Sequence, residues 1–488
     1  MLHGTGEGAI TNVLGCFTLE IDTTTVIKVN ANGYNGVMMR VNPGDSLTIM
    51  LRANDSGLRQ LEGDDNLVKA FVKSLERYQF FSTVERLLNI YVDQYFPLNG
   101  KDSKIELGEF SSFFGSNHLE GVNLEMGFRT TNYFSRHLFL KGHSSYGFKD
   151  RKIKYGGSVE YSFAPKERYS YSFPVNSITL THDYGSYKIG QQAFDMGIYE
   201  PTVTLNLQSN NKLLYKRFSQ IKYTLENRHH FSCELSLEHN QIISSYLMPL
   251  LTATGVEVDK YTMAGMKLRL RYAPLEQLED NNFTRKRLIG NTPVFVFSHT
   301  WYPKHFLGGD YELNKTEFGI YNRVGILRNG YIEGFLNVGK IWNKGVPYPS
   351  LLYANSNLSL FMQNNSFSLL DPMEFPLSEY CTLDLCLNTG GLLVNRIPLC
   401  SKLTEVLSLK CLWGHLSGGN NPMEADVIRI PKTVDWGTLE YDKPYAEVGI
   451  GIDNILSLLR IDYVHRLSYR NRANTHNRGF RLKLTINI

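Results

Sequence analysis

The sequence predicts an all-β fold, a transmembrane antiparallel β-barrel of about 14 to 16 strands. From about residue 104 onward, segments of about 9 to 13 residues have strand character and are separated by turns or polar loops. The connections alternate between short ones, such as the hairpin signal at residues 329–330, and long ones, such as residues 343–366. Membrane barrels combine strands of this length with short turns at one rim and long loops at the other. The pattern therefore favours a membrane barrel over a soluble β-protein.

Several of these segments alternate apolar and polar residues, most clearly 231–238 (FSCELSLE), 267–272 (KLRLRY) and 459–470 (LRIDYVHRLSYR). Because successive strand side chains point to opposite faces, one face would meet lipid and the other would line the lumen. The charged residues expected in the lumen are Lys267, Arg269, Arg271, Arg460, Asp462 and Arg466. Together with carboxylates such as Glu234 they either neutralise one another or line a substrate path, and mutual neutralisation is the favoured expectation.

The last ten residues, GFRLKLTINI (479–488), keep the alternation to the end of the chain. A membrane barrel leaves no strand edge unpaired in lipid, so its last strand must be paired. We therefore expect this segment to close the barrel against the first strand, with Phe480 facing lipid and Arg481 and Lys483 facing the lumen.

The region before residue 104 has a different character. Residues 9–51 contain short strand segments with turn signals between them, which predicts a partial β-sandwich over residues 1–53. Residues 63–97 repeat apolar residues at helical spacing. The sequence thus predicts a helical linker over residues 54–103 and a barrel over residues 104–488.

Composition and motifs exclude several classes of function. A net charge of +4 and 20% charged residues do not suggest a nucleic-acid binder. The six cysteines include no CxxC pair and are expected to be free thiols. No known catalytic, nucleotide or metal motif occurs, so we expect neither an enzyme nor a bound cofactor or metal. The apolar runs are too short for a membrane helix, and the N-terminus shows no signal peptide.

A first motif-bearing block, EGVNLEMGFRTT (120–131) followed by LKGHSSYGFKDRKIKYGGSVEYSF (140–163), resembles the start of the barrel in a Gram-negative outer-membrane family of unknown function. The matching positions include Glu120, Gly121, Arg129, Tyr146, Lys149, Asp150, Lys154 and Tyr155. A second block, MEFPLSEY (373–380) with VNRIPL (394–399), resembles the C-terminal half of that barrel. Its matching positions include Glu374, Phe375, Asn395 and Pro398. Residues 445–470 are similar to its penultimate hairpin.

Members of that family carry a carboxypeptidase D regulatory-like domain, a non-catalytic accessory domain, which the N-terminal segment resembles. Its first strand is not visible before residue 8, so the chain is expected to be a fragment, a copy with a mis-called start or a degenerate copy. The resemblance implies an outer-membrane location with a periplasm-facing N-terminal domain. The implied partners are outer-membrane lipid, the barrel-assembly machinery and a periplasmic protein bound by that domain, with no nucleic acid.

The expected function is that of a non-enzymatic outer-membrane barrel in surface transport or envelope assembly. One alternative is an assembly or secretion barrel that acts on client proteins. The other is a soluble β-rich carbohydrate-binding or hydrolytic protein.

Overall fold

The computed structural model describes residues 25–29, 37–43 and 95–488, except for 168, 193, 199–209, 275, 277, 281–284, 288–292, 327–329, 393, 395–402, 456–458, 473–474 and 485–488. The chain divides into two compact units, residues 1–89 and 90–488. In the first unit, β1 (Thr25–Val29) and β2 (Val37–Val41) form an antiparallel hairpin. The other predicted N-terminal strands and the predicted helix up to residue 94 lie outside the described residues.

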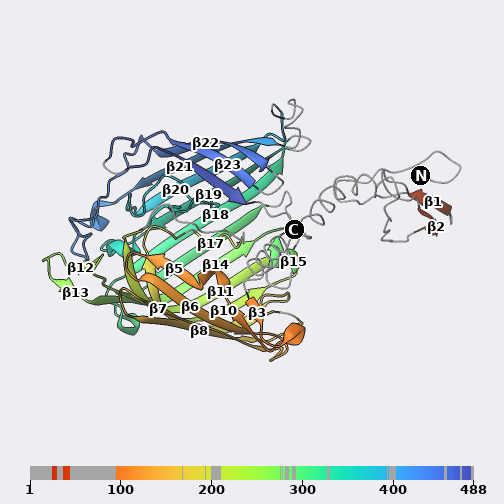
Figure 1. Cartoon of the computed structure of the whole chain (residues 1–488), viewed down its shortest axis with the longest axis horizontal. Coiled ribbons are helices and arrows are strands. Elements are labelled where there is room, and N and C mark those ends of the chain that lie inside the picture. The colour runs from red at the N-terminus through yellow and green to blue at the C-terminus, as the bar shows by residue number, and fades with distance from the viewer. Residues whose placement is uncertain are drawn as a thin grey trace, which may run out of the picture. The chain divides into compact units, whose positions relative to one another are not determined.

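The second unit is an antiparallel β-barrel, shown in Figure 1, which confirms the predicted fold class. Its wall consists of β3 (Tyr95–Pro97), β4 (Ile105–Gly108), β5 (Phe114–Asn117), β6 (Gly121–Thr130), β7 (Leu138–Gly147), β8 (Ile153–Ser162), β9 (Asn176–Lys188), β10 (Leu213–Glu226), β11 (Phe231–Ile243), β14 (Lys260–Tyr272), β17 (Val294–Tyr302), β18 (Leu313–Gly325), β19 (Tyr331–Ile341), β20 (Glu379–Asn388), β21 (Thr404–His415), β22 (Tyr445–Ile455), β23 (Leu459–Arg466) and β24 (Arg478–Leu484). Two small hairpins are separate from the wall: β12 (Leu250–Leu251) with β13 (Glu257–Val258), and β15 (Leu278–Asp280) with β16 (Arg285–Arg287). In the described part of the chain, the only helical turns are short 3₁₀ segments, and no helix is long and apolar enough to cross a bilayer.

The strand order is that of a closed barrel in which β24 is followed by β3. Short β4 and β5 pair with successive parts of β6, Ile105 with Thr130 and Phe114 with Leu124, so they are two pieces of one wall strand. The wall contains 18 strand segments. Because β4 and β5 count as one strand, the barrel has 17 strands, one more than the upper limit of the prediction.

The predicted helix is wrong at its end, because Tyr95–Pro97 is strand β3, paired with β4. The barrel wall thus begins before residue 104, inside the predicted linker. Pro97 has no backbone N–H to donate, which disfavours a helix interior and is tolerated in a short strand.

On most wall strands, the pairing registers separate an outer face rich in apolar side chains from an inner face that holds most of the buried polar and charged ones. On β6, for example, the outward Met126 is 59% exposed, and on β22 the outward Ile450 is 62% exposed. On β11 and β14, the outward pair Leu235 and Leu268 alternates with the inward pair Ser236 and Lys267.

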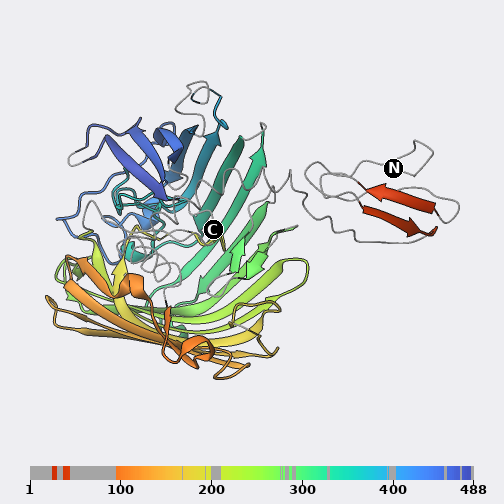
Figure 2. The same ribbon diagram turned by 45° about the vertical axis from the view of Figure 1, so that its right-hand side comes forward.

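The main hydrophobic core lies inside the barrel rather than between two layers. It forms where residues 342–378, which connect β19 to β20, fold against inward side chains of the wall; we call this segment the lumenal loop. Its Leu352, Phe367 and Leu377 are buried beside wall residues such as Tyr445. Figure 2 shows coil segments of this colour range (teal) within the ring of strands.

Candidate functional site

The first block of motif residues forms a buried cluster between two turns. The β5–β6 turn carries Glu120, and the β7–β8 turn carries Asp150. Lys154 at the start of β8 lies between them, with its Nζ 3.1 Å from Glu120 and 2.7 Å from Asp150. All three side chains are almost wholly buried. We call this ion-paired cluster the turn lock.

Further contacts hold the turn lock in place. The amides of Asn117 and Asn123 donate to Glu120, and the Tyr215 hydroxyl donates to Asp150 at 2.7 Å. Burial alone would raise the pKa of Asp150, but the hydrogen bonds from Lys154 and Tyr215 lower it below the ordinary value.

The remaining residues of that block have separate positions. Gly121 has φ +68° and a Cβ there would lie 2.9 Å from the Cβ of Lys149, so only glycine fits this turn. Arg129 faces inward and binds Glu106 at 2.7 Å. Tyr146 and Tyr155 lie on the outer face and are partly exposed. They contribute to the apolar wall rather than to the turn lock.

The second block brings the lumenal loop to the wall through a buried ion pair. Arg466 on β23 donates to both oxygens of Glu374, at 2.6 and 3.2 Å. The Arg466 side chain is 0% exposed and that of Glu374 is 3% exposed. The neighbouring Phe375 is buried against the rings of Tyr445 and Tyr469. This bidentate pair anchors the loop on the inside of the barrel.

Other inward side chains of the last strands hold the backbone of the same loop. Glu447 on β22 accepts hydrogen bonds from the backbone N–H groups of Ser368 and Leu369, at 2.9 and 2.7 Å. Lys410 on β21 donates to the carbonyl of Ser366 at 2.5 Å, and Arg481 on β24 donates to the carbonyl of Ser368. The charges of this part of the wall therefore bind a loop rather than line an empty lumen.

The loop also pairs with the last described strand. The N–H of Leu482 donates to the carbonyl of Leu360, at 2.9 Å, and the N–H of Met362 donates to the carbonyl of Leu482, at 2.6 Å. Phe361 and Leu482 thus form a parallel bridge on the β24 edge that faces away from β23. We call this pairing the edge clasp. The sequence predicted a closing strand but not that a loop occupies part of its edge.

The other predicted lumen charges are also inward and mostly paired. Arg460 binds Asp462 on the same strand at 2.6 Å, and both are buried. Arg271 binds Glu276 at 2.7 Å, and Arg269 binds Glu234 at 2.8 Å. Lys267 lies in the wall of a cavity described below.

Two predicted positions, Asn395 and Pro398, lie outside the described residues. Cys233, Cys381, Cys386 and Cys411 are free thiols, while Cys16 and Cys400 are not described. Within the described ranges, no group of His, Cys, Asp and Glu side chains is arranged to hold a metal ion. Glu120 and Glu374 belong to separate clusters, since Glu120 binds Lys154 and Glu374 binds Arg466.

Sequence reasoning missed Lys410, Glu447 and the clasp residues 360–362. The alternation of apolar and polar residues around Lys410 and Glu447 does indicate that both side chains point inward. No local signal in residues 360–362 identifies β24 as their partner.

The family described as "Family of unknown function (DUF5686) C-terminal domain" matches residues 88–418. The chain belongs to this family. In this DUF5686 member the match covers the turn lock and the whole lumenal loop, including Glu374, whereas Arg466 and the clasp residue Leu482 lie beyond its end. It begins after most of the N-terminal unit, so the regulatory-like character of residues 1–53 stays a prediction.

No curated protein matches this DUF5686 chain. Among solved structures it is similar to the crystal structure of BamA from Haemophilus ducreyi lacking POTRA domains 1-3. The identity is 11% and the TM-score 0.46, over 80% of this chain and 73% of that chain.

Proposed function

We propose that this protein is a non-enzymatic β-barrel of the outer membrane that works in envelope assembly. In this proposal it binds an extended segment of a client polypeptide at the edge of β24. The edge clasp is the observation that carries the proposal.

The membrane location is supported by the two faces of the wall. Large apolar side chains are exposed on the outer face of many wall strands, whereas most of the buried charged side chains of the wall point inward. In water such an outer surface would cost free energy on the order of 25 cal/mol for each Å² of apolar area left exposed. In a bilayer the same surface is matched to lipid tails.

The client role is supported by what the clasp does to the strand edge. An unpaired strand edge is a template for another extended segment. In this structure the carbonyl of Leu360 and the N–H of Met362 occupy the N–H and the carbonyl of Leu482, in a short parallel bridge. If the lumenal loop moves away, the same N–H and carbonyl groups become available to a client.

A disulfide across the clasp tests this. In a cysteine-free background, Phe361→Cys with Leu482→Cys should lock the loop on the edge when oxidised. The probe is a fluorescent peptide with the sequence of residues 357–365, NLSLFMQNN. Fluorescence anisotropy should show peptide binding to the reduced protein and its loss on oxidation.

The matched control is Ser356→Cys with Phe367→Cys, which joins two bridged residues within the lumenal loop and does not cross-link the loop to β24. Its peptide binding should be the same in both redox states. Equal binding to the locked and reduced clasp variant, or no binding to either, contradicts the proposal.

A solute path through the lumen is the second candidate, favoured by a polar cavity inside the barrel. Planar-bilayer conductance tests it, because reversing a lumen charge with Arg269→Glu should change ion selectivity. Unchanged conductance in that variant removes this candidate.

Membrane fractionation tests the soluble alternative, which requires protein that stays in solution without detergent.

A further inference from the structure

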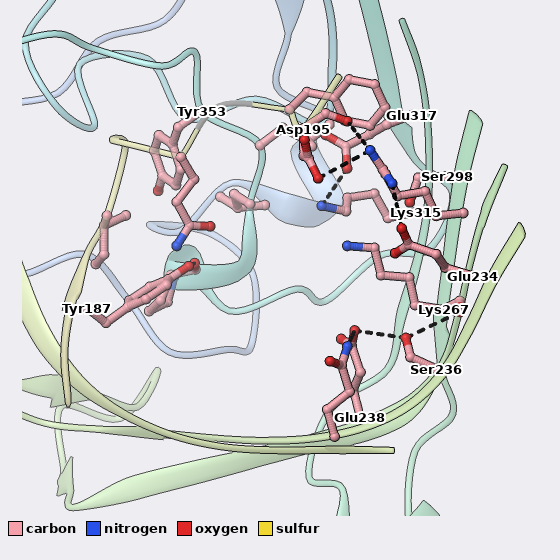
Figure 3. A pocket seen from close by; sticks show the side chains of 18 of the residues that line it. Tyr187, Asp195, Glu234, Ser236, Glu238, Lys267, Ser298, Lys315, Glu317 and Tyr353 are labelled. Atoms are coloured by element: carbon pink, nitrogen blue, oxygen red, sulfur yellow. Dashed lines mark hydrogen bonds and ion pairs between the residues drawn. The ribbon is translucent and has the colours of Figure 1, made fainter. Parts of the chain in front are cut away.

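A polar cavity of about 270 Å³ lies inside the barrel (Figure 3), and none of the clasp residues lines it. Its outer side is formed by inward residues of β10, β11, β14, β17 and β18. The rest of its lining comes from Tyr187 on β9, from Ile189, Gly190, Gln192, Phe194 and Asp195 after that strand, and from the start of the lumenal loop. Since one water molecule needs only about 10 to 15 Å³, the space is large enough for a small organic molecule.

The carboxylates of this cavity already have partners. Glu234 binds Arg269 at 2.8 Å, and Glu317 binds Lys315 at 2.8 Å. Glu238 accepts hydrogen bonds from Gln220, Ser236 and Tyr302. The acceptors of the site are therefore largely satisfied by the protein.

Several donors are not satisfied. Ser298 Oγ and Arg269 Nε are buried without a hydrogen-bond partner, and these residues are only 2% and 9% exposed. Lys222 and Lys267 also line the cavity. Their amines form no direct hydrogen bond or ion pair within the described residues, although the charge of Lys267 attracts the nearby carboxylates of Glu238 and Glu317. A buried donor without an acceptor costs about 1 to 3 kcal/mol, so the cavity favours a molecule rich in acceptor oxygens.

The opposite side of the cavity has another chemistry. Figure 3 shows Tyr187 and Tyr353 across the space from Lys267, Ser298 and Glu234. Leu351 and Leu352, which precede Tyr353 in the lumenal loop, also line the cavity. Asp195, whose side chain is 73% exposed, connects the site to solvent.

We propose that this cavity binds a small organic anion. Its oxyanion group, a phosphate or a carboxylate, accepts hydrogen bonds from Ser298, Arg269 and Lys267. Its carbon skeleton lies against Tyr187 and Tyr353. The proposal rests on the unused donors and is independent of the client role of β24.

Calorimetric titration of the full chain in detergent tests this binding. Glycerol 3-phosphate, inorganic phosphate and succinate serve as probes, and glycerol serves as the neutral control. At least one anion should bind saturably, whereas glycerol should not. Preference for glycerol 3-phosphate or for succinate then distinguishes a phosphate from a carboxylate ligand.

Variants locate the binding. Lys267→Gln should weaken anion binding about tenfold or more. Ser298→Ala should weaken it by a smaller factor. The matched control is Lys340→Gln, a half-exposed lysine of the outer wall, which should bind as the parent does. Unchanged gel mobility of unheated samples shows that each variant is folded.

Two results overturn the proposal. If no anion binds saturably, the cavity holds only water. If binding is equally strong in Lys267→Gln, or is weakened as much by Lys340→Gln, the anion binds elsewhere on the protein.

Discussion

The two sides of the lumen use the same kind of residue in different ways. On β11, β14 and β18, inward charges pair with other wall residues of the same or a neighbouring strand, as Arg269 does with Glu234. On β21 to β24, four inward charges bind the lumenal loop: Lys410, Glu447, Arg466 and Arg481. One side thus keeps a cavity with free donors, whereas the other is filled by a loop that reaches a strand edge.

Removing the loop anchor should have the largest effect. Arg466→Leu removes the bidentate partner of the buried Glu374 and leaves it only the longer contact with Arg472, 3.7 Å away. Weakening a buried ion pair in this way costs on the order of 3 kcal/mol. We expect the lumenal loop to leave the wall, so a protease should cut within residues 342–378 faster than in the parent.

The double variant Arg466→Leu with Glu374→Leu is the control, because it leaves no buried charge of this pair without a counterion. It should recover most of the protease resistance. If the double variant is as sensitive as the sum of both single variants, the ion pair is not what holds the loop.

A smaller effect with a different location is expected at the turn lock. Lys154→Met leaves Glu120 and Asp150 facing each other in a buried site, although the neutral donors Asn117 and Tyr215 remain. We expect a loss of about 2 to 4 kcal/mol in barrel stability, measured by the denaturant concentration at which the gel mobility changes.

That variant sharpens the comparison only if the loop stays docked. Protease cleavage within residues 342–378 of folded Lys154→Met should proceed at the parent's rate. Cleavage as fast as in Arg466→Leu would show that the two regions are coupled, and the comparison would fail.

Alternation was sufficient to predict the fold class, because the period of two fixes which face each side chain occupies. The same pattern places Arg269 and Arg466 on an inward face, yet one binds a neighbouring strand and the other a loop. Parity determines the side of the wall, while the partner depends on how distant segments fold into the lumen.

The errors have the same origin. Tyr95–Pro97 continues a helical spacing, and only its pairing with β4 makes it a strand. GFRLKLTINI reads as a closing strand, but nothing within it indicates that Leu360 and Met362 occupy its edge at Leu482. The sequence identified Glu120, Asp150 and Lys154 by resemblance and Arg466 by alternation, but only the structure shows which of these charges pair.

The finest test of the comparison is the pH dependence of loop docking. Burial, and then repulsion from Glu374, raise the pKa of Asp371 in the lumenal loop. A raised pKa in the docked state means that its contribution is fully present below the ordinary carboxyl value of 3.8 and is lost as pH rises through the raised value. Asp371→Asn should therefore dock more firmly than the parent near neutral pH and should lose this advantage in acid.

The measurement is the rate of proteolysis within the loop, with proteases that work across this range. Asp435→Asn, which changes a 60% exposed carboxylate beside the same loop, should leave the pH profile unchanged. A profile of Asp371→Asn parallel to the parent's would show that the loop's fit to the wall does not depend on this carboxyl.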